Sequence, residues 1–82
     1  MRRELYIAGP AGADEPADWK LTRDSVLLSY HDTQEAAVQE GARRANLRLS
    51  VLGVLSEMQI RGRDGRIQDP RTYGNDPRDV PG

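Results

Sequence analysis

The chain has 82 residues, with 12 basic and 13 acidic side chains and a formal net charge of -1. This length suits a single domain, and the balanced charge argues against a protein that binds polyanions through bulk charge alone. Since there is no cysteine and only one histidine, the chain offers neither a disulfide nor the ligands of the usual zinc sites, and we expect no metal.

Short alternating segments predict three strands in the first part of the chain. Residues 4–8 alternate and are rich in strand-forming side chains. Residues 9–18 hold two prolines, two glycines and three acids, which is typical of a loop. Residues 19–23 and 26–30 alternate on either side of Asp24-Ser25, which predicts a hairpin with a tight turn.

One long helix is expected to follow Asp32. Asp32 is the predicted N-cap, and Glu35 stands three residues later, at the capping-box position. Apolar residues then recur at steps of four and three, which places them on one stripe, and Gly53 is a natural C-terminal stop. The stripe consists of Val38, Ala42, Ala45, Leu49 and Leu52.

The last third of the chain predicts a second hairpin and a tail. Residues 55–61 alternate again, and Asp64-Gly65 is a strong signal for a hairpin turn, with Gly65 at positive φ. Residues 66–68 are the expected return strand. We predict one domain over residues 1–68 and an irregular tail over residues 69–82, where three prolines and two glycines occur.

These elements predict an α+β fold of the order β-β-β-α-β-β. An antiparallel sheet of about four to five strands, with one long helix packed on one face, is the economical two-layer arrangement. The apolar positions that share a face in each element are the expected core. They are Trp19, Leu21, Val26, Leu28, Val38, Ala42, Ala45, Leu49, Met58 and Ile60.

Four segments of the chain resemble motifs of a bacterial family known as domain of unknown function 2188 (DUF2188). They are Trp19, the helix start DTQEAA at 32–37, the hairpin GRDGRI at 62–67 and the segment TYGNDP at 72–77. The resemblance covers roughly Trp19 to Pro77 and implies a fold and a bacterial or phage setting. It implies no activity, because the family has none assigned. The segment from Leu47 to Leu55 is longer and more apolar than in the family, so the end of the helix stays open.

The sequence contains no recognisable catalytic set. Ser25, Ser29, Ser50 and Ser56 lack a glycine elbow, and His31 is the only side chain of the usual general-base type for a serine nucleophile. We therefore predict a protein that is not an enzyme and that needs no cofactor.

Two functions remain as hypotheses. The first is a small cytoplasmic bacterial or phage accessory protein that binds another protein, with self-association through an exposed sheet edge as the simplest mode. The second is a nucleic-acid-binding module that uses the arginine-rich hairpin 61–71. No membrane segment is expected, because the apolar runs are too short.

The candidate binding residues lie in the hairpin and in the tail. They are Arg61, Arg63, Arg66, Arg71, Tyr73 and Asn75, while Trp19, Asp32, Glu35, Asp64 and Gly65 have expected structural roles. An alternative for the arginines is a solvated hairpin in which they pair with Glu57, Asp64 and Asp69. An alternative for Tyr73 is that it folds back over the sheet.

Overall fold

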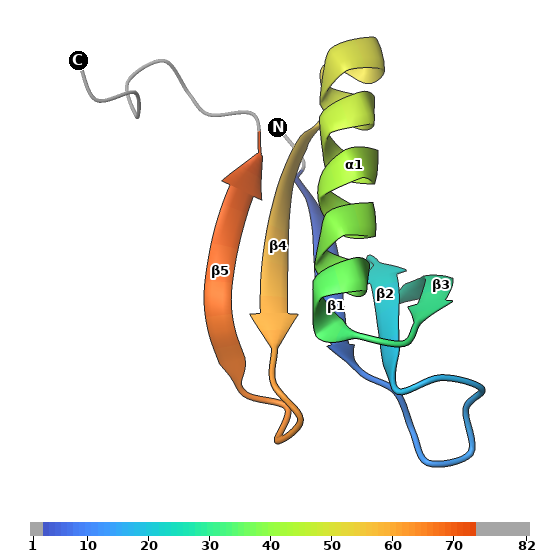
Figure 1. The fold of residues 1–82 in the computed structure, drawn as a ribbon. Coiled ribbons are helices and arrows are strands. Elements are labelled where there is room, and N and C mark those ends of the chain that lie inside the picture. The colour runs from blue at the N-terminus through green and yellow to red at the C-terminus, as the bar shows by residue number, and fades with distance from the viewer. Residues whose placement is uncertain (1–2, 74–82) are drawn as a thin grey trace.

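The computed structural model describes residues 3–73, the last three of them by their backbone alone. It contains five strands and one helix in the expected order β-β-β-α-β-β, so the predicted α+β fold is confirmed (Figure 1). The elements are β1 (Arg3–Pro10), β2 (Trp19–Arg23), β3 (Val26–His31), α1 (Gln34–Leu52), β4 (Leu55–Arg61) and β5 (Ile67–Tyr73).

The five strands form one sheet in the order β3-β2-β1-β4-β5. The β2–β3 and β4–β5 hairpins and the β1–β2 pair are antiparallel, but β1 and β4 run parallel. The sheet is therefore mixed rather than antiparallel throughout. The parallel pair arises because α1 carries the chain back across the sheet, so that β4 starts at the same end as β1.

The helix begins one residue later than the sequence suggested. Thr33 is the N-cap: its backbone is extended, and its Oγ1 accepts a hydrogen bond from the N–H of Ala36 at 3.1 Å. The prediction of Asp32 as the cap was wrong, and Glu35 is consequently not at the capping-box position. Both are exposed. Aspartate ranks above threonine as an N-cap residue, which is why the sequence favoured Asp32, but a threonine hydroxyl can fill the same role.

The other end of the helix is the predicted one. Gly53 has φ 68°, and its N–H donates to the carbonyl of Leu49 at 2.9 Å. The left-handed conformation closes the last turn and ends the helix at Leu52. This places the end of the helix within the segment Leu47 to Leu55, where the sequence left it open.

The core lies between α1 and the sheet. It consists of Tyr6, Ala8, Trp19, Leu21, Ala37, Ala45, Met58 and Ile60, with Leu28 and Val38 packed against it. The helix contributes its small residues, because Ala37, Gly41 and Ala45 are the buried positions of α1.

Part of the predicted core was wrong. Ala42 and Leu49 flank the closest approach of α1 to the sheet and stay partly exposed, while Leu52 is 60% exposed. Val26 is 61% exposed because it lies at the end of the edge strand β3. A bulge in the β2–β3 pairing leaves Leu28 as the extra residue, between the pairs Leu21–Ser29 and Thr22–Leu27.

Strand β5 is longer than expected. It runs to Tyr73 and pairs along β4, with Gln59 opposite Pro70 and Ser56 opposite Tyr73. Residues 69–73 thus belong to the sheet and not to an irregular tail. Pro70 hid the strand from the sequence pattern, and β5 tolerates it because it is an edge strand.

Candidate binding surface

The side of the sheet opposite α1 carries the most continuous surface without a covering element among residues 3–73 (Figure 1). Side chains alternate across a strand. Because Tyr6, Ala8, Leu21, Met58 and Ile60 are buried under the helix, their neighbours in each strand point the other way. We call this side the open face. Its central residues are Leu5, Ile7, Gly9, Lys20, Thr22, Leu27, Tyr30, Glu57, Gln59, Arg61, Ile67 and Pro70.

The strand register arranges these residues in rows that cross the sheet. The middle row contains no charge and spans all five strands, with Thr22 paired to both Leu27 and Ile7, and Gln59 paired to both Ile7 and Pro70. Leu27 is 46% exposed. A row of this kind can be buried against another protein without leaving an ionised group buried and unpaired.

A basic row lies next to the middle row, toward the β4–β5 turn. Lys20 pairs with Tyr30 and Gly9, and Arg61 pairs with Ile67. A Cβ placed on Gly9 would lie 3.5 Å from the Cβ of Arg61, so these two residues are neighbours in the row. Because Gly9 has no side chain, a hollow of about 240 Å³ opens there, with Ile7, Lys20, Thr22 and Arg61 among its lining residues.

Lys20 and Tyr30 are both held by Glu15 from the β1–β2 loop. Lys20 Nζ lies 3.0 Å from Glu15 Oε1, which also accepts the N–H of Gly12 at 2.9 Å. The Gly12 hydrogen bond, followed by those from Tyr30 and Lys20, lowers the pKa of Glu15 to about 2. The same hydrogen bond to Glu15 raises the pKa of Tyr30. The lysine charge is therefore largely neutralised locally, and Arg61 is left as the main cation of the row.

Arg61 is half-buried and has no carboxylate partner among the described residues. Its Nη2 donates to Gln59 Oε1 at 2.9 Å, and its Nε is buried without a hydrogen-bond partner. On the other side of the middle row stands Glu57, which is 52% exposed and pairs weakly with Arg3 at 3.4 Å. The open face therefore has a cation on one side of an uncharged row and a carboxylate on the other.

The hairpin arginines do not come together. Arg61 lies on the open face, whereas the guanidinium of Arg63 stacks over the ring of the core residue Trp19, with its Cζ 5.4 Å from the ring centroid. Arg66 is 88% exposed and lies 3.8 Å from Asp64. The three described arginines thus point to different surroundings, and two of them have local partners.

The turn of this hairpin has the predicted form. Gly65 has φ 80°, its N–H donates to the carbonyl of Gly62 at 2.9 Å, and Asp64 Oδ1 accepts the N–H of Arg66 at 3.0 Å. Trp19 is a core residue, and Asp64 and Gly65 form the turn. Arg71 and Tyr73 are described by their backbone positions in β5, opposite Met58 and Ser56, and Asn75 lies outside the described residues.

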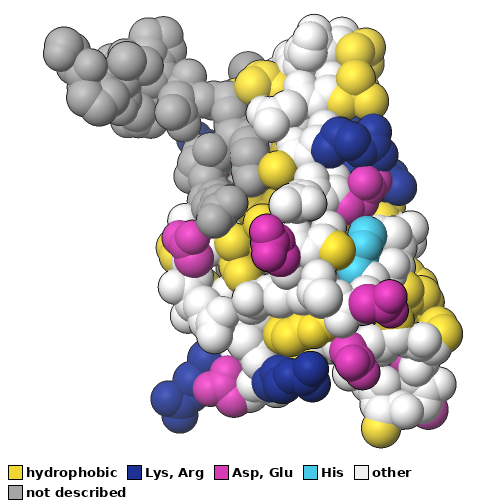
Figure 2. Space-filling model, viewed as in Figure 1, with side chains coloured by type: hydrophobic (Ala, Val, Ile, Leu, Met, Phe, Trp, Pro, Cys, Tyr) yellow, Lys and Arg dark blue, Asp and Glu magenta, His cyan; other side chains and the backbone are white. Residues whose placement is uncertain are grey.

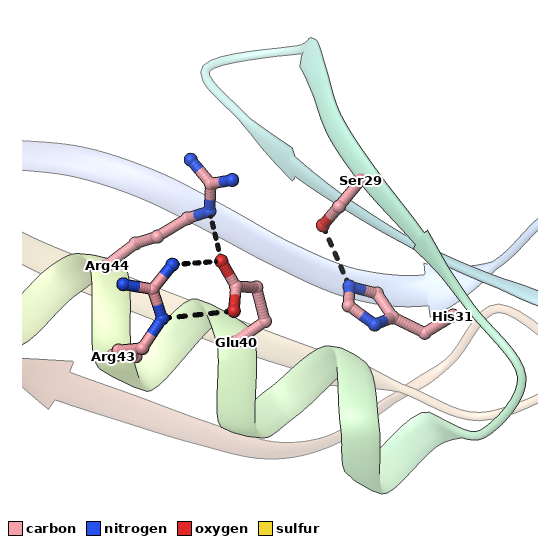
Figure 3. A network of polar contacts seen from close by, with 5 residues as sticks. All are labelled: Ser29, His31, Glu40, Arg43 and Arg44. Atoms are coloured by element: carbon pink, nitrogen blue, oxygen red, sulfur yellow. Dashed lines mark hydrogen bonds and ion pairs between the residues drawn. The ribbon is translucent and has the colours of Figure 1, made fainter.

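A polar cluster lies on the helix side, between β3 and α1 (Figure 3). Ser29 Oγ is 2.8 Å from His31 Nε2 on β3, and Glu40 of α1 binds both Arg43 and Arg44. The hydrogen bonds from Arg43, and to a lesser degree from Arg44, lower the pKa of Glu40 to about 2. Sequence reasoning did not foresee the Ser29–His31 pair, although the i, i+2 spacing on a strand was its signal.

Within the described residues, no third side chain joins this pair through a hydrogen bond. A serine–histidine pair needs a third group to orient the imidazole and donors for an oxyanion, and no hydrogen bond from another described side chain reaches His31. The described residues also include no group of three His, Asp or Glu side chains suited to a metal ion.

Acidic and basic side chains are interspersed on this side of the molecule (Figure 2).

A partly buried ion pair ties the helix to the sheet. Arg48 of α1 binds Glu4 of β1 through two hydrogen bonds of 2.5 Å and 2.7 Å, and Arg23 of β2 lies 4.0 Å from the same carboxylate. The bidentate geometry fixes the last turns of α1 over β1. This contact is structural and leaves the open face untouched. The only helix of the described region, α1, does not combine the length and the apolar character that crossing a membrane requires.

Comparison with protein families matches residues 10–73 to DUF2188, described as an uncharacterized protein conserved in bacteria. The match spans the β2–β3 hairpin, the helix and the β4–β5 hairpin. No curated protein and no solved structure matches the chain at the significance applied.

Proposed function

The chain belongs to the DUF2188 family of bacterial proteins of unknown function, and we propose that it is a protein-binding module that works through the open face of its sheet. The observation that carries the proposal is the middle row, which crosses all five strands without a charge and has no covering element among residues 3–73. An uncharged row with the apolar residues Leu27, Ile7 and Pro70 can be covered by a partner without burying an unpaired charge.

The chemistry of the described residues supports a role without catalysis. The Ser29–His31 pair has no orienting partner, and the hollow at Gly9 is lined by two cations and aliphatic or hydroxyl side chains without a carboxylate or histidine base. We propose that the protein acts by occupying the surface of a partner, as a small accessory protein in the bacterial cytoplasm.

The nucleic-acid alternative has less support. A basic surface that follows a phosphate backbone needs several cations on one side, and Arg63 and Arg66 are directed to Trp19 and Asp64 instead of toward Arg61. Arg3, Lys20 and Arg61 remain as outward cations on the open face, and Arg3 and Lys20 are already paired with carboxylates.

A pull-down from the native cell tests the proposal. The wild-type protein, Thr22→Arg in the middle row and Val51→Arg on the exposed side of α1 (69% exposed) serve as baits. We expect the wild type and Val51→Arg to retain the same proteins after nuclease treatment, and Thr22→Arg to lose them. Circular dichroism establishes that both variants are folded. Retention that disappears with nuclease, or that survives Thr22→Arg, contradicts the proposal.

A further inference from the structure

We propose that the occupant of the open face is a second copy of this chain, stacked face to face about a two-fold axis that runs along the middle row. This inference rests on the proposed function, since it names the partner for the same surface. A two-fold interface brings the same patch of both copies together, so the patch must be complementary to itself. The open face meets this condition in charge and in shape.

The charge complementarity comes from strand β4. Its outward residues are Glu57, Gln59 and Arg61, so a carboxylate and a guanidinium stand at equal distances on either side of the middle row. Rotation by 180° about that row reverses the strand. Glu57 of each copy then lies over Arg61 of the other, and Gln59 lies over its own equivalent. Two ion pairs form, and each uses an arginine that has no carboxylate partner within its own described chain.

The shape complementarity comes from strand β1. Its outward residues are Leu5, Ile7 and Gly9, again centred on the middle row. The same rotation places Leu5 of one copy over Gly9 of the other, where the hollow of about 240 Å³ lies. Side chains of stacked sheets interdigitate across a spacing of about 10 Å. Such packing requires a large side chain such as Leu5 to face a small residue such as Gly9.

Stacking of faces is favoured over pairing of edges. The edge strands β3 and β5 are poorly suited to pairing with another strand. The β2–β3 and β4–β5 pairings each contain a register shift, which interrupts a continuous hydrogen-bond ladder. In addition, β5 includes Pro70, which has no N–H to donate. The open face, by contrast, is continuous across the sheet.

The expected dimer is small and reversible. Five strands spaced by about 4.8 Å and three rows spaced by about 6.6 Å along the strands give a flat area of about 480 Å² per copy. Twice this area is below the roughly 1,600 Å² of a standard stable interface. We therefore expect association at micromolar concentrations or above.

Charge reversal on β4 tests the proposal. Sedimentation equilibrium, from about 10 µM to about 1 mM, is measured for the wild type, Glu57→Arg, Arg61→Glu and the double variant. Each single change places like charges opposite each other, and we expect it to weaken the dimer by about tenfold or more. The double variant restores opposite charges between copies and should return to within about threefold of the wild type.

This rescue cannot arise within one chain. Four residues along a strand span about 13 Å, so side chains 57 and 61 do not pair directly in either arrangement. Thr22→Arg brings two guanidinium groups together on the axis and should be monomeric, while its melting curve establishes that it is folded. A wild-type protein that stays monomeric at 1 mM, or a double variant no better than the single ones, overturns the dimer. If Thr22→Arg still loses other proteins in the pull-down, the proposed protein-binding function stands without it.

Discussion

Gly65 holds the turn between β4 and β5 in a left-handed conformation, with φ 80° and open space where a Cβ would stand. The cost of a side chain there is therefore one of backbone conformation and not of packing. We expect Gly65→Ala to lower the free energy of unfolding by about 1 kcal/mol, measured by urea denaturation. Gly65→Asn should cost less, because asparagine tolerates this conformation. Equal losses for the two variants would mean that the turn changes its conformation.

Glu40 makes the stability of α1 sensitive to acid. Hydrogen bonds from Arg43, and then Arg44, hold the pKa of Glu40 at about 2, below its ordinary value of 4.5. A carboxyl group whose pKa falls on folding stabilises the protein above the unfolded value, and this contribution is lost as pH falls from 4.5 toward 2.

We expect Glu40→Gln to be less stable than the wild type at pH 7 by up to about 1 kcal/mol, since partly exposed ion pairs contribute little. The difference should shrink as pH falls below 4.5 and should be largely lost by pH 2, where Glu40 of the folded protein is partly protonated. Urea denaturation at pH 7, 4 and 2 measures it. A constant difference at all three values would show that Glu40 acts through packing instead of charge.

At the scale of the element, α1 depends on small side chains where it meets the sheet. Ala37, Gly41 and Ala45 recur every four residues and are buried, so the helix backbone lies close to β1, β2 and β4. A Cβ on Gly41 would overlap the terminal methyl group of Met58 and would touch Leu21, both of which are fully buried. The close approach leaves larger residues on the flanks of the contact.

Gly41→Leu should force the helix away from the sheet. We expect it to lower the free energy of unfolding by about 2–3 kcal/mol, because overpacking of a filled core outweighs the better helix propensity of leucine. Asn46→Leu introduces the same side chain on the exposed side of α1. As the matched control, it should change stability by about 0.5 kcal/mol or less. Thermal melts compare the two. A Gly41→Leu protein as stable as the control would mean that the helix does not lie as close as described.

The sequence predicted each element but not always its orientation. Alternation located β1, β2, β3 and β4, and Asp64-Gly65 located the last turn, because these signals are local. The predicted apolar stripe of α1 was wrong in detail; it consisted of Val38, Ala42, Ala45, Leu49 and Leu52. Counting apolar residues favours large side chains, whereas only small side chains fit where α1 lies closest to the sheet. The cap at Thr33 was missed because Asp32 next to it has a higher N-cap preference.

The candidate surface could not be predicted from the sequence, for a different reason. Alternation shows that Leu5 and Ile7 share a side of β1, but not which side the helix covers. Gly9 was assigned to the following loop, whereas β1 extends to Pro10. That depends on the strand order and on the parallel pairing of β1 with β4, which join residues far apart in the chain. The hairpin arginines were likewise grouped by their closeness in sequence, while the turn directs Arg61 and Arg63 to opposite sides of the sheet.

For the molecule as a whole, the described residues leave the side of the five-stranded sheet opposite α1 without a covering element. A chain of this size has a small core and a modest margin of stability, so a second layer contributed by another copy would stabilise it as well as serve binding. The self-complementary arrangement of Glu57 and Arg61 about Gln59 gives that layer a defined orientation.

Self-association through the open face is tested most directly by ¹⁵N–¹H correlation spectra of the wild-type protein recorded over a dilution series. Binding through the open face predicts concentration-dependent shifts at the amides of β1, β2 and β4, centred on Ile7, Thr22 and Gln59. The amides on the exposed side of α1, such as Gln39 and Val51, should stay constant. Shifts centred on α1, or no shift up to about 1 mM, would contradict self-association through the open face.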